Sequence, residues 1–119
     1  MQTYRGTVKY VYVVLELVHA ARYRGLTTYQ QVATIMGLPT TGNYMGQQVG
    51  IILGEISEDE VAAGRPMLSA IAVKASGEVG PGFYVLAREL ARPGADGDEQ
   101  AFREAESQRV YDAWRYPPE

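Results

Sequence analysis

The side chains best suited to reading a base-pair edge lie in and just before Gly42–Gly54, a stretch without a single charged residue. They are Thr40, Thr41, Asn43, Tyr44, Gln47 and Gln48. Asn and Gln amides can form two hydrogen bonds with an adenine edge, and Thr hydroxyls can reach a phosphate. Polar uncharged residues also simply solvate surface helices, but surface helices usually carry Lys and Glu. The absence of charge therefore favours recognition.

Cations that could contact phosphates are few: Arg22, Arg24 and Lys74. The chain of 119 residues has a formal net charge of −3. This balance argues against nucleic acid, because phosphate binding usually leaves a basic footprint. The charge is segregated, however, since residues 1–54 carry net +3 and residues 55–119 carry net −6. The positive half is the half that holds the uncharged stretch.

Covalent and metal chemistry has little support in the sequence. The chain has no cysteine, which excludes thiol nucleophiles, disulfides and thiolate zinc sites. His19 is the only histidine and has only Glu16 as a nearby acid, so no Ser-His-Asp arrangement can be built. The consecutive acids 58–60 suit the start of a helix better than a metal site, because they face different directions. We predict no catalysis, no cofactor and no metal.

The spacing of apolar residues predicts the helices that must position the polar stretch. A first helix is expected over Tyr4–Tyr23. Its apolar stripe consists of Tyr4, Val8, Val11, Leu15 and Val18, widened by Val14, Leu17 and Ala21. A second helix is expected over Thr28–Met36, because Thr caps precede it and Gly37 can end it. The turn after Gly37 leads to a third helix that starts near Thr41 or Gly42.

The third helix should run through Gly54 and on towards Ala63, with a kink or a new helix start at Ser57. Its buried stripe is Met45, Val49, Ile52 and Ile56. Met67–Lys74 is the best strand in the chain, and a hairpin-type turn should lead to a short return strand at Val79. Helices over Phe83–Ala91 and Asp98–Arg115 complete the chain.

This order of helix, helix, helix and β wing predicts a mainly α domain with a small β wing, in the α+β class. The expected fold is a helix-turn-helix or winged helix with an added C-terminal helix. We expect a single domain over 1–119, with an N-terminal helix at 4–24, a core at about 26–82 and C-terminal helices at 83–116.

One segment resembles a known family. Thr28-Tyr29-Gln30-Gln31-Val32-Ala33, then Gly37, Pro39 and Met45-Gly46, is similar to the C-terminal winged-helix domain of O6-alkylguanine-DNA alkyltransferases and alkyltransferase-like proteins. That family has Thr-Tyr-x-x-hydrophobic-Ala, Gly-x-Pro and a recognition helix with Arg-Ala-Val-Gly at this spacing. The ungapped match covers Thr28–Gly46 and extends loosely to about Gly82. The resemblance implies a DNA-binding scaffold with Thr28 and Tyr29 on the DNA side, Tyr29 near a phosphate.

The departures from that family concern its reactive residues. The methyl-accepting cysteine corresponds to Met67, and a thioether cannot form the thiolate that alkyl transfer requires. The family's histidine and arginine beside it correspond to Leu68 and Ser69. The arginine that enters the base stack corresponds to Asn43, which argues against base flipping.

Two functional hypotheses follow. The first is a non-catalytic DNA-binding module that reads duplex DNA through its third helix. The second is a winged-helix interaction or adaptor module without DNA binding. Its interface, with a second copy or another protein, would be the tyrosine-rich first helix or the acidic second half. The chain has no apolar stretch long enough to span a bilayer, and Met1–Gly6 does not open a secretory signal, so we expect a cytoplasmic protein with no membrane partner.

Overall fold

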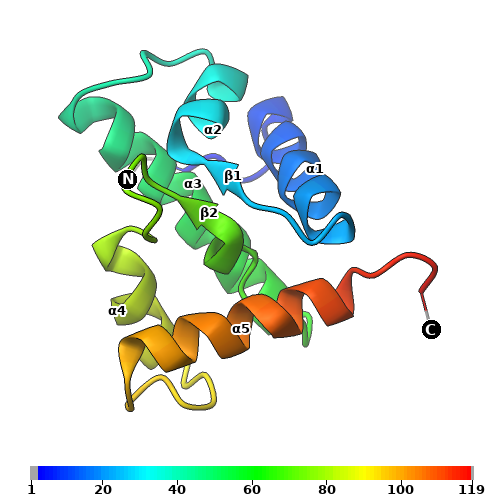
Figure 1. Ribbon diagram of the computed structural model, residues 1–119. Helices are drawn as coiled ribbons and strands as arrows, with labels where there is room; N and C mark the ends of the chain where they lie inside the picture. Colours follow the sequence, from blue (N-terminus) through cyan, green and yellow to red (C-terminus); the bar gives the residue numbers. More distant parts are fainter. Residues whose placement is uncertain (1–2, 119) are drawn as a thin grey trace.

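The computed structural model describes residues 3–118, and the ends of the expected 1–119 domain lie outside this range (Figure 1). The described chain is mostly helical with one small parallel sheet, in agreement with a mainly α class. The elements are α1 Val8–Arg22, β1 Thr27–Thr28, α2 Tyr29–Met36, α3 Asn43–Ala62, the 3-10 helix η1 Leu68–Ile71, β2 Ala72–Val73, α4 Pro81–Glu89 and α5 Glu99–Ala113. None of the described helices has the length and apolarity needed to span a bilayer.

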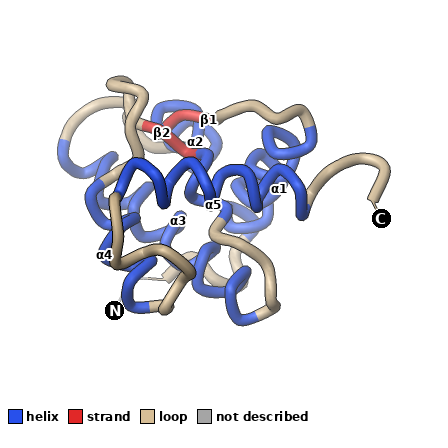
Figure 2. The backbone as a smooth tube through the Cα atoms, turned by 60° about the horizontal axis from the view of Figure 1, so that its bottom comes forward, coloured by secondary structure: helices blue, strands red, loops and turns tan. Residues whose placement is uncertain are grey.

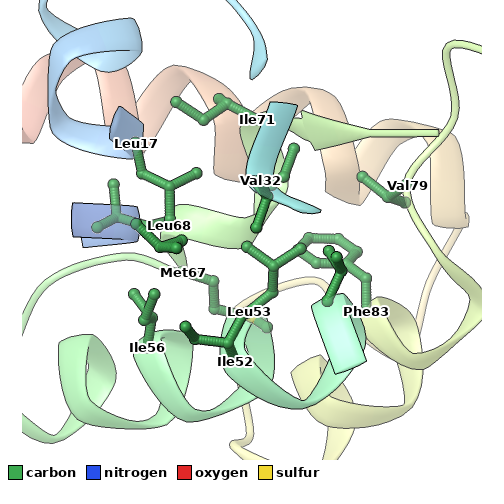
Figure 3. Close-up of a cluster of buried hydrophobic side chains, with 14 of the residues drawn as sticks. Leu17, Val32, Ile52, Leu53, Ile56, Met67, Leu68, Ile71, Val79 and Phe83 are labelled. Atoms are coloured by element: carbon green, nitrogen blue, oxygen red, sulfur yellow. The ribbon is translucent and has the colours of Figure 1, made fainter. Parts of the chain in front are cut away.

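The long helix α3 runs through the middle of the molecule, and α5 crosses the side that Figure 2 brings forward. The predicted stripe of α3 is confirmed: Met45, Val49, Ile52 and Ile56 are all buried. Figure 3 shows Leu68 of η1 and Leu17 of α1 packed above Ile56. The core therefore lies between α1, α3 and η1.

The boundaries of α2 follow from local chemistry, as predicted. The Thr28 hydroxyl accepts a hydrogen bond from the Gln31 N–H at 3.1 Å and caps the helix start. Gly37 ends the helix in the left-handed conformation, with φ 73°, which glycine adopts at little cost. The turn that follows leads directly into α3, so that α2 and α3 pack against each other.

The predicted apolar face of the first helix is wrong in part: Leu17 and Ala21 are buried as predicted, but three other predicted positions face outwards. Val8, Val11 and Leu15 are 65%, 54% and 56% exposed. The residues of α1 that are buried are Val13, Leu17 and Ala21. The helix also begins at Val8 rather than Tyr4, because Thr7 caps it. Both faces of α1 are apolar, so periodicity alone could not say which one meets the core.

Ser57 does not start a new helix, contrary to prediction. It is buried inside α3, and its hydroxyl lies 2.7 Å from the Ser69 hydroxyl and accepts from the Ser69 N–H at 3.2 Å. Both serines are buried. A residue type that favours helix caps is used here instead to bind the backbone of η1.

Half of the strand expected over Met67–Lys74 is a 3-10 helix, Leu68–Ile71, and the strand itself is limited to Ala72 and Val73. Helices surround η1, so the backbone of Met67–Ile71 bonds locally and to side chains instead of to a neighbouring strand. The Ala70 carbonyl accepts from the Ser107 hydroxyl at 3.2 Å, and the Met67 N–H donates to Glu106 at 3.0 Å. These bonds satisfy buried backbone groups that a strand would have paired.

The expected return strand of the β wing is not formed at Val79 in the described structure. The segment closes as a turn, with the Lys74 N–H donating to the Glu78 carbonyl and the Gly77 N–H to the Lys74 carbonyl, both at 2.8 Å. β2 pairs instead with β1, in parallel, with Thr27 beside Ala72 and Thr28 beside Val73. This pairing ties the start of α2 to the end of η1.

Candidate functional site

A groove with a volume of about 1080 Å³ runs between the first half of α3 and the start of α4. The α3 wall includes Asn43, Gly46, Gln47 and Gly50, and the opposite wall includes Gly80–Phe83. Tyr29 from α2 and Lys74 from the turn after β2 complete the lining. The fold therefore brings together, at one groove, five of the residues predicted to form the site: Tyr29, Asn43, Gln47, Gln48 and Lys74.

The polar residues at the start of α3 face solvent, with one exception. Thr40, Thr41, Asn43, Tyr44 and Gln47 are exposed. Gln48 is buried, and its side-chain oxygen accepts a hydrogen bond from the Tyr4 hydroxyl. Its predicted position on the outer face is therefore corrected: Gln48 holds the N-terminal segment against α3. Thr28, which is exposed, caps α2.

Three glycines spaced four residues apart line the groove along α3: Gly46, Gly50 and Gly54. A Cβ at Gly46 or Gly50 would meet no atom within 4 Å. Glycine inside a helix costs about 1 kcal/mol relative to alanine. Because an alanine methyl would fit at both positions, local packing does not explain the glycines at 46 and 50. Their effect is to leave the helix backbone open to the groove. The four-residue spacing of these glycines is visible in the sequence, but the apolar and polar periodicity that predicts a helix face gives glycine no weight.

Two helices begin at the groove without a side-chain cap. The N-cap of α3 is Gly42, with φ 95°, and the N-cap of α4 is Gly80. Because Gly42 offers no side-chain acceptor, N–H groups of the first turn of α3 remain available at the positive end of the helix dipole. At the start of α4 the Gly82 N–H remains, since Pro81 has no N–H and the Phe83 N–H donates to the Gly80 carbonyl at 3.1 Å. Lys74 adds a positive charge to the same lining. Helix starts of this kind favour phosphate or carboxylate groups.

Tyr29 fixes the position of the α4 start. A Cβ at Gly80 would overlap the Tyr29 hydroxyl oxygen, so only glycine fits here. Burial raises the pKa of Tyr29, and a hydrogen bond from the Gly80 backbone opposes this rise. The hydroxyl that the family resemblance assigned to a phosphate is thus in contact with the protein's own backbone.

The other end of the groove is acidic. Glu55 and Glu58 belong to its lining, and Arg5 lies over both, 3.5 Å from Glu55 and 2.6 Å from Glu58. Arg5 also contacts Asp59 at 3.1 Å. The Arg5 side chain neutralises part of the charge at this acidic end, and the start of α3 is the end of the groove that suits anions.

Arg22 and Arg24 do not lie at this groove. The Arg22 guanidinium is 4.6 Å from the centre of the Tyr116 ring, and Arg24 is 3.6 Å from Asp112. Both therefore contact the C-terminal segment. The structure does not bring these two predicted phosphate contacts together with Lys74.

Met67, at the position of the family's reactive cysteine, is fully buried in the core. The fold is thus mainly helical, and its groove lies between α3 and the start of α4, with α2 and the turn after β2 completing the lining. Comparisons of the chain with protein-family models, curated proteins and solved structures give no significant match.

Proposed function

We propose that the protein binds duplex DNA without covalent chemistry, as a helix-turn-helix module in which α3 enters the major groove. The observation that carries the proposal is the start of α3: an exposed, uncharged surface that shares one groove with two uncapped helix starts and Lys74. Major-groove helices typically contact base edges with residues of their first turns. The resemblance of Thr28–Gly46 to the alkyltransferase family supports the same orientation.

Each exposed residue has a role that its chemistry suits. Asn43 and Gln47 lie one turn apart and can bond adenine edges. The hydroxyls of Thr40 and Thr41, on the turn before α3, can reach phosphates on one strand. Lys74 and the uncapped start of α4 lie across the groove and suit a second phosphate position. Tyr44, 55% exposed, offers an aromatic face at the same surface.

The test is fluorescence anisotropy with labelled duplexes of random and selected sequence. Asn43→Ala combined with Gln47→Ala should weaken binding to a preferred sequence by about 1–3 kcal/mol per lost contact and leave random duplex nearly unchanged. Gln100→Ala, at an exposed position on α5, is the matched control. Absence of any binding at about 50 mM salt would contradict the proposal.

A second candidate function is protein binding by an adaptor or subunit that does not bind DNA. Two observations favour it: carboxylates lie at one end of the groove, and the outer side of α1 is apolar. The same anisotropy experiment separates the two, because an adaptor gives no salt-dependent signal with duplex.

A further inference from the structure

The outer side of α1 carries an apolar stripe that nothing in the described structure covers. Val8, Val11, Tyr12 and Leu15 are between 54% and 65% exposed. They stand at i, i+3, i+4 and i+7, the spacing of residues that pack between two helices. Large apolar side chains are usually exposed singly, so four neighbours on one helix face mark an interaction surface.

The stripe leads into a hollow of about 640 Å³ between α1 and α2. Leu15, His19 and Ile35 are among its lining residues. Tyr12 of the stripe also lines the hollow, and the earlier residues Val8 and Val11 are exposed outside it on the same helix. Exposed apolar side chains beside a hollow on one helix suit a self-complementary contact, because each copy contributes both.

The charges beside the stripe indicate how two copies would align. Lys9 and Glu16 are seven residues apart, so both lie on the same flank of the stripe. In an antiparallel helix pair, residues on the same flank face each other across the two-fold axis. An axis near Tyr12 places Lys9 of each copy beside Glu16 of the other. Lys9 makes no ion pair within residues 3–118, and one Glu16 oxygen accepts from the Thr27 hydroxyl at 2.9 Å.

We infer that the protein forms a two-fold symmetric homodimer through antiparallel packing of α1 against α1, with Val8 of each copy at the other's hollow. Covering the exposed halves of four large side chains on each copy buries on the order of 800 Å². The flanking polar residues bring the contact to about 1,000 Å², the lower limit of specific interfaces. The dimer is therefore in equilibrium with monomer. It does not depend on DNA binding, since no residue of α1 lines the groove between α3 and α4.

The test is sedimentation equilibrium over a wide protein concentration range, near and above micromolar. The wild-type protein should show a reversible monomer–dimer equilibrium. Leu15→Glu should weaken dimerisation at least about tenfold, because it places a carboxylate in the apolar centre of the contact. Val85→Glu on α4, where the valine is 50% exposed, is the matched control and should leave the equilibrium unchanged.

A charge exchange tests the antiparallel alignment itself. Lys9→Glu alone and Glu16→Lys alone should each weaken the homodimer, because like charges then face each other twice. An equimolar mixture of these two variants should dimerise more tightly than either does alone, since both facing pairs become opposite in charge. A wild-type protein that stays monomeric throughout, equal effects of Leu15→Glu and Val85→Glu, or a mixture no tighter than its components would each overturn the inference.

Discussion

At the scale of single residues, the absence of a side chain at Gly80 lets the start of α4 pack directly against Tyr29. Its backbone contacts the Tyr29 hydroxyl, and this contact sets where α4 begins. Gly80→Ala should lower the free energy of unfolding by about 1–3 kcal/mol, because the added methyl overlaps the tyrosine. Urea denaturation measures this. Gly82→Ala meets no atom within 4 Å and should not destabilise, so equal losses in the two variants would contradict the explanation.

Glu106 is the second decisive single residue, since it is fully buried and binds Arg92 at 2.8 Å, Arg109 at 2.7 Å and the Met67 N–H. Burial acts to raise its pKa, but the hydrogen bonds from Arg92, Met67 and Arg109 outweigh burial and hold the pKa below the ordinary 4.5. The ionised Glu106 carboxylate therefore contributes its full stabilisation above pH 4.5, and this stabilisation is lost as the pH falls through the lowered pKa.

Glu106→Gln should accordingly cost about 3 kcal/mol of unfolding free energy at neutral pH, because it leaves two arginines without their carboxylate. The difference between the wild type and this variant should shrink in acid, below the ordinary pKa of 4.5. Urea denaturation at several pH values gives both quantities. Glu104→Gln, an exposed residue on the same helix, is the control. A difference that stays constant down to strongly acidic pH would rule out the assignment.

At the scale of elements, α3 combines a packed inner face with an outer face of glycines. Gly50→Leu should raise the stability of the helix by up to about 1 kcal/mol, since leucine is the better helix former and a Cβ at this position meets no neighbour. The same side chain should enter the groove and weaken DNA binding. Thermal unfolding and anisotropy on the same sample separate these effects. Unchanged affinity in a stabilised variant would show that the groove is not used.

At the scale of the whole molecule, the positive half of the sequence does not become a positive face. Arg5 is bound to Glu58 and Asp59, and Arg24 lies beside Asp112. Positive residues of the first half thus meet acids of the second half. The net charge of the groove is consequently small, and its affinity for DNA should depend on few phosphate contacts.

Salt titration of DNA binding measures this electrostatic arrangement. With Lys74 as the main cation at the groove, log K should fall against log salt with a slope of about −1 to −2. Lys74→Ala should reduce the magnitude of the slope by about 1, whatever the DNA sequence. Arg22→Ala with Arg24→Ala should leave the slope unchanged, because both side chains contact the C-terminal segment. If this double variant instead reduced the magnitude of the slope, the DNA would bind on the side of the molecule that carries Arg22 and Arg24, away from the groove.

Local chemistry in the sequence was enough to place α2 and the inner face of α3. Thr28 and Gly37 determine where α2 begins and ends, and the stripe from Met45 to Ile56 determines the inner face of α3. These features depend only on neighbouring residues and on the period of the helix, which is why they could be predicted. The same stripe predicts that Asn43 and Gln47 are exposed, because both lie outside it.

Only the tertiary structure decided which of two apolar faces of α1 is buried, because both have helical spacing and the choice depends on what α3 and η1 present. It also turned the expected strand at Met67–Lys74 into η1, since helices surround the segment and Ser57, Glu106 and Ser107 supply its hydrogen bonds. The groove itself joins Lys74 and Gly80 to α3 across long sequence separations. Such juxtapositions depend on packing between distant segments, for which no local pattern in the sequence carries a signal.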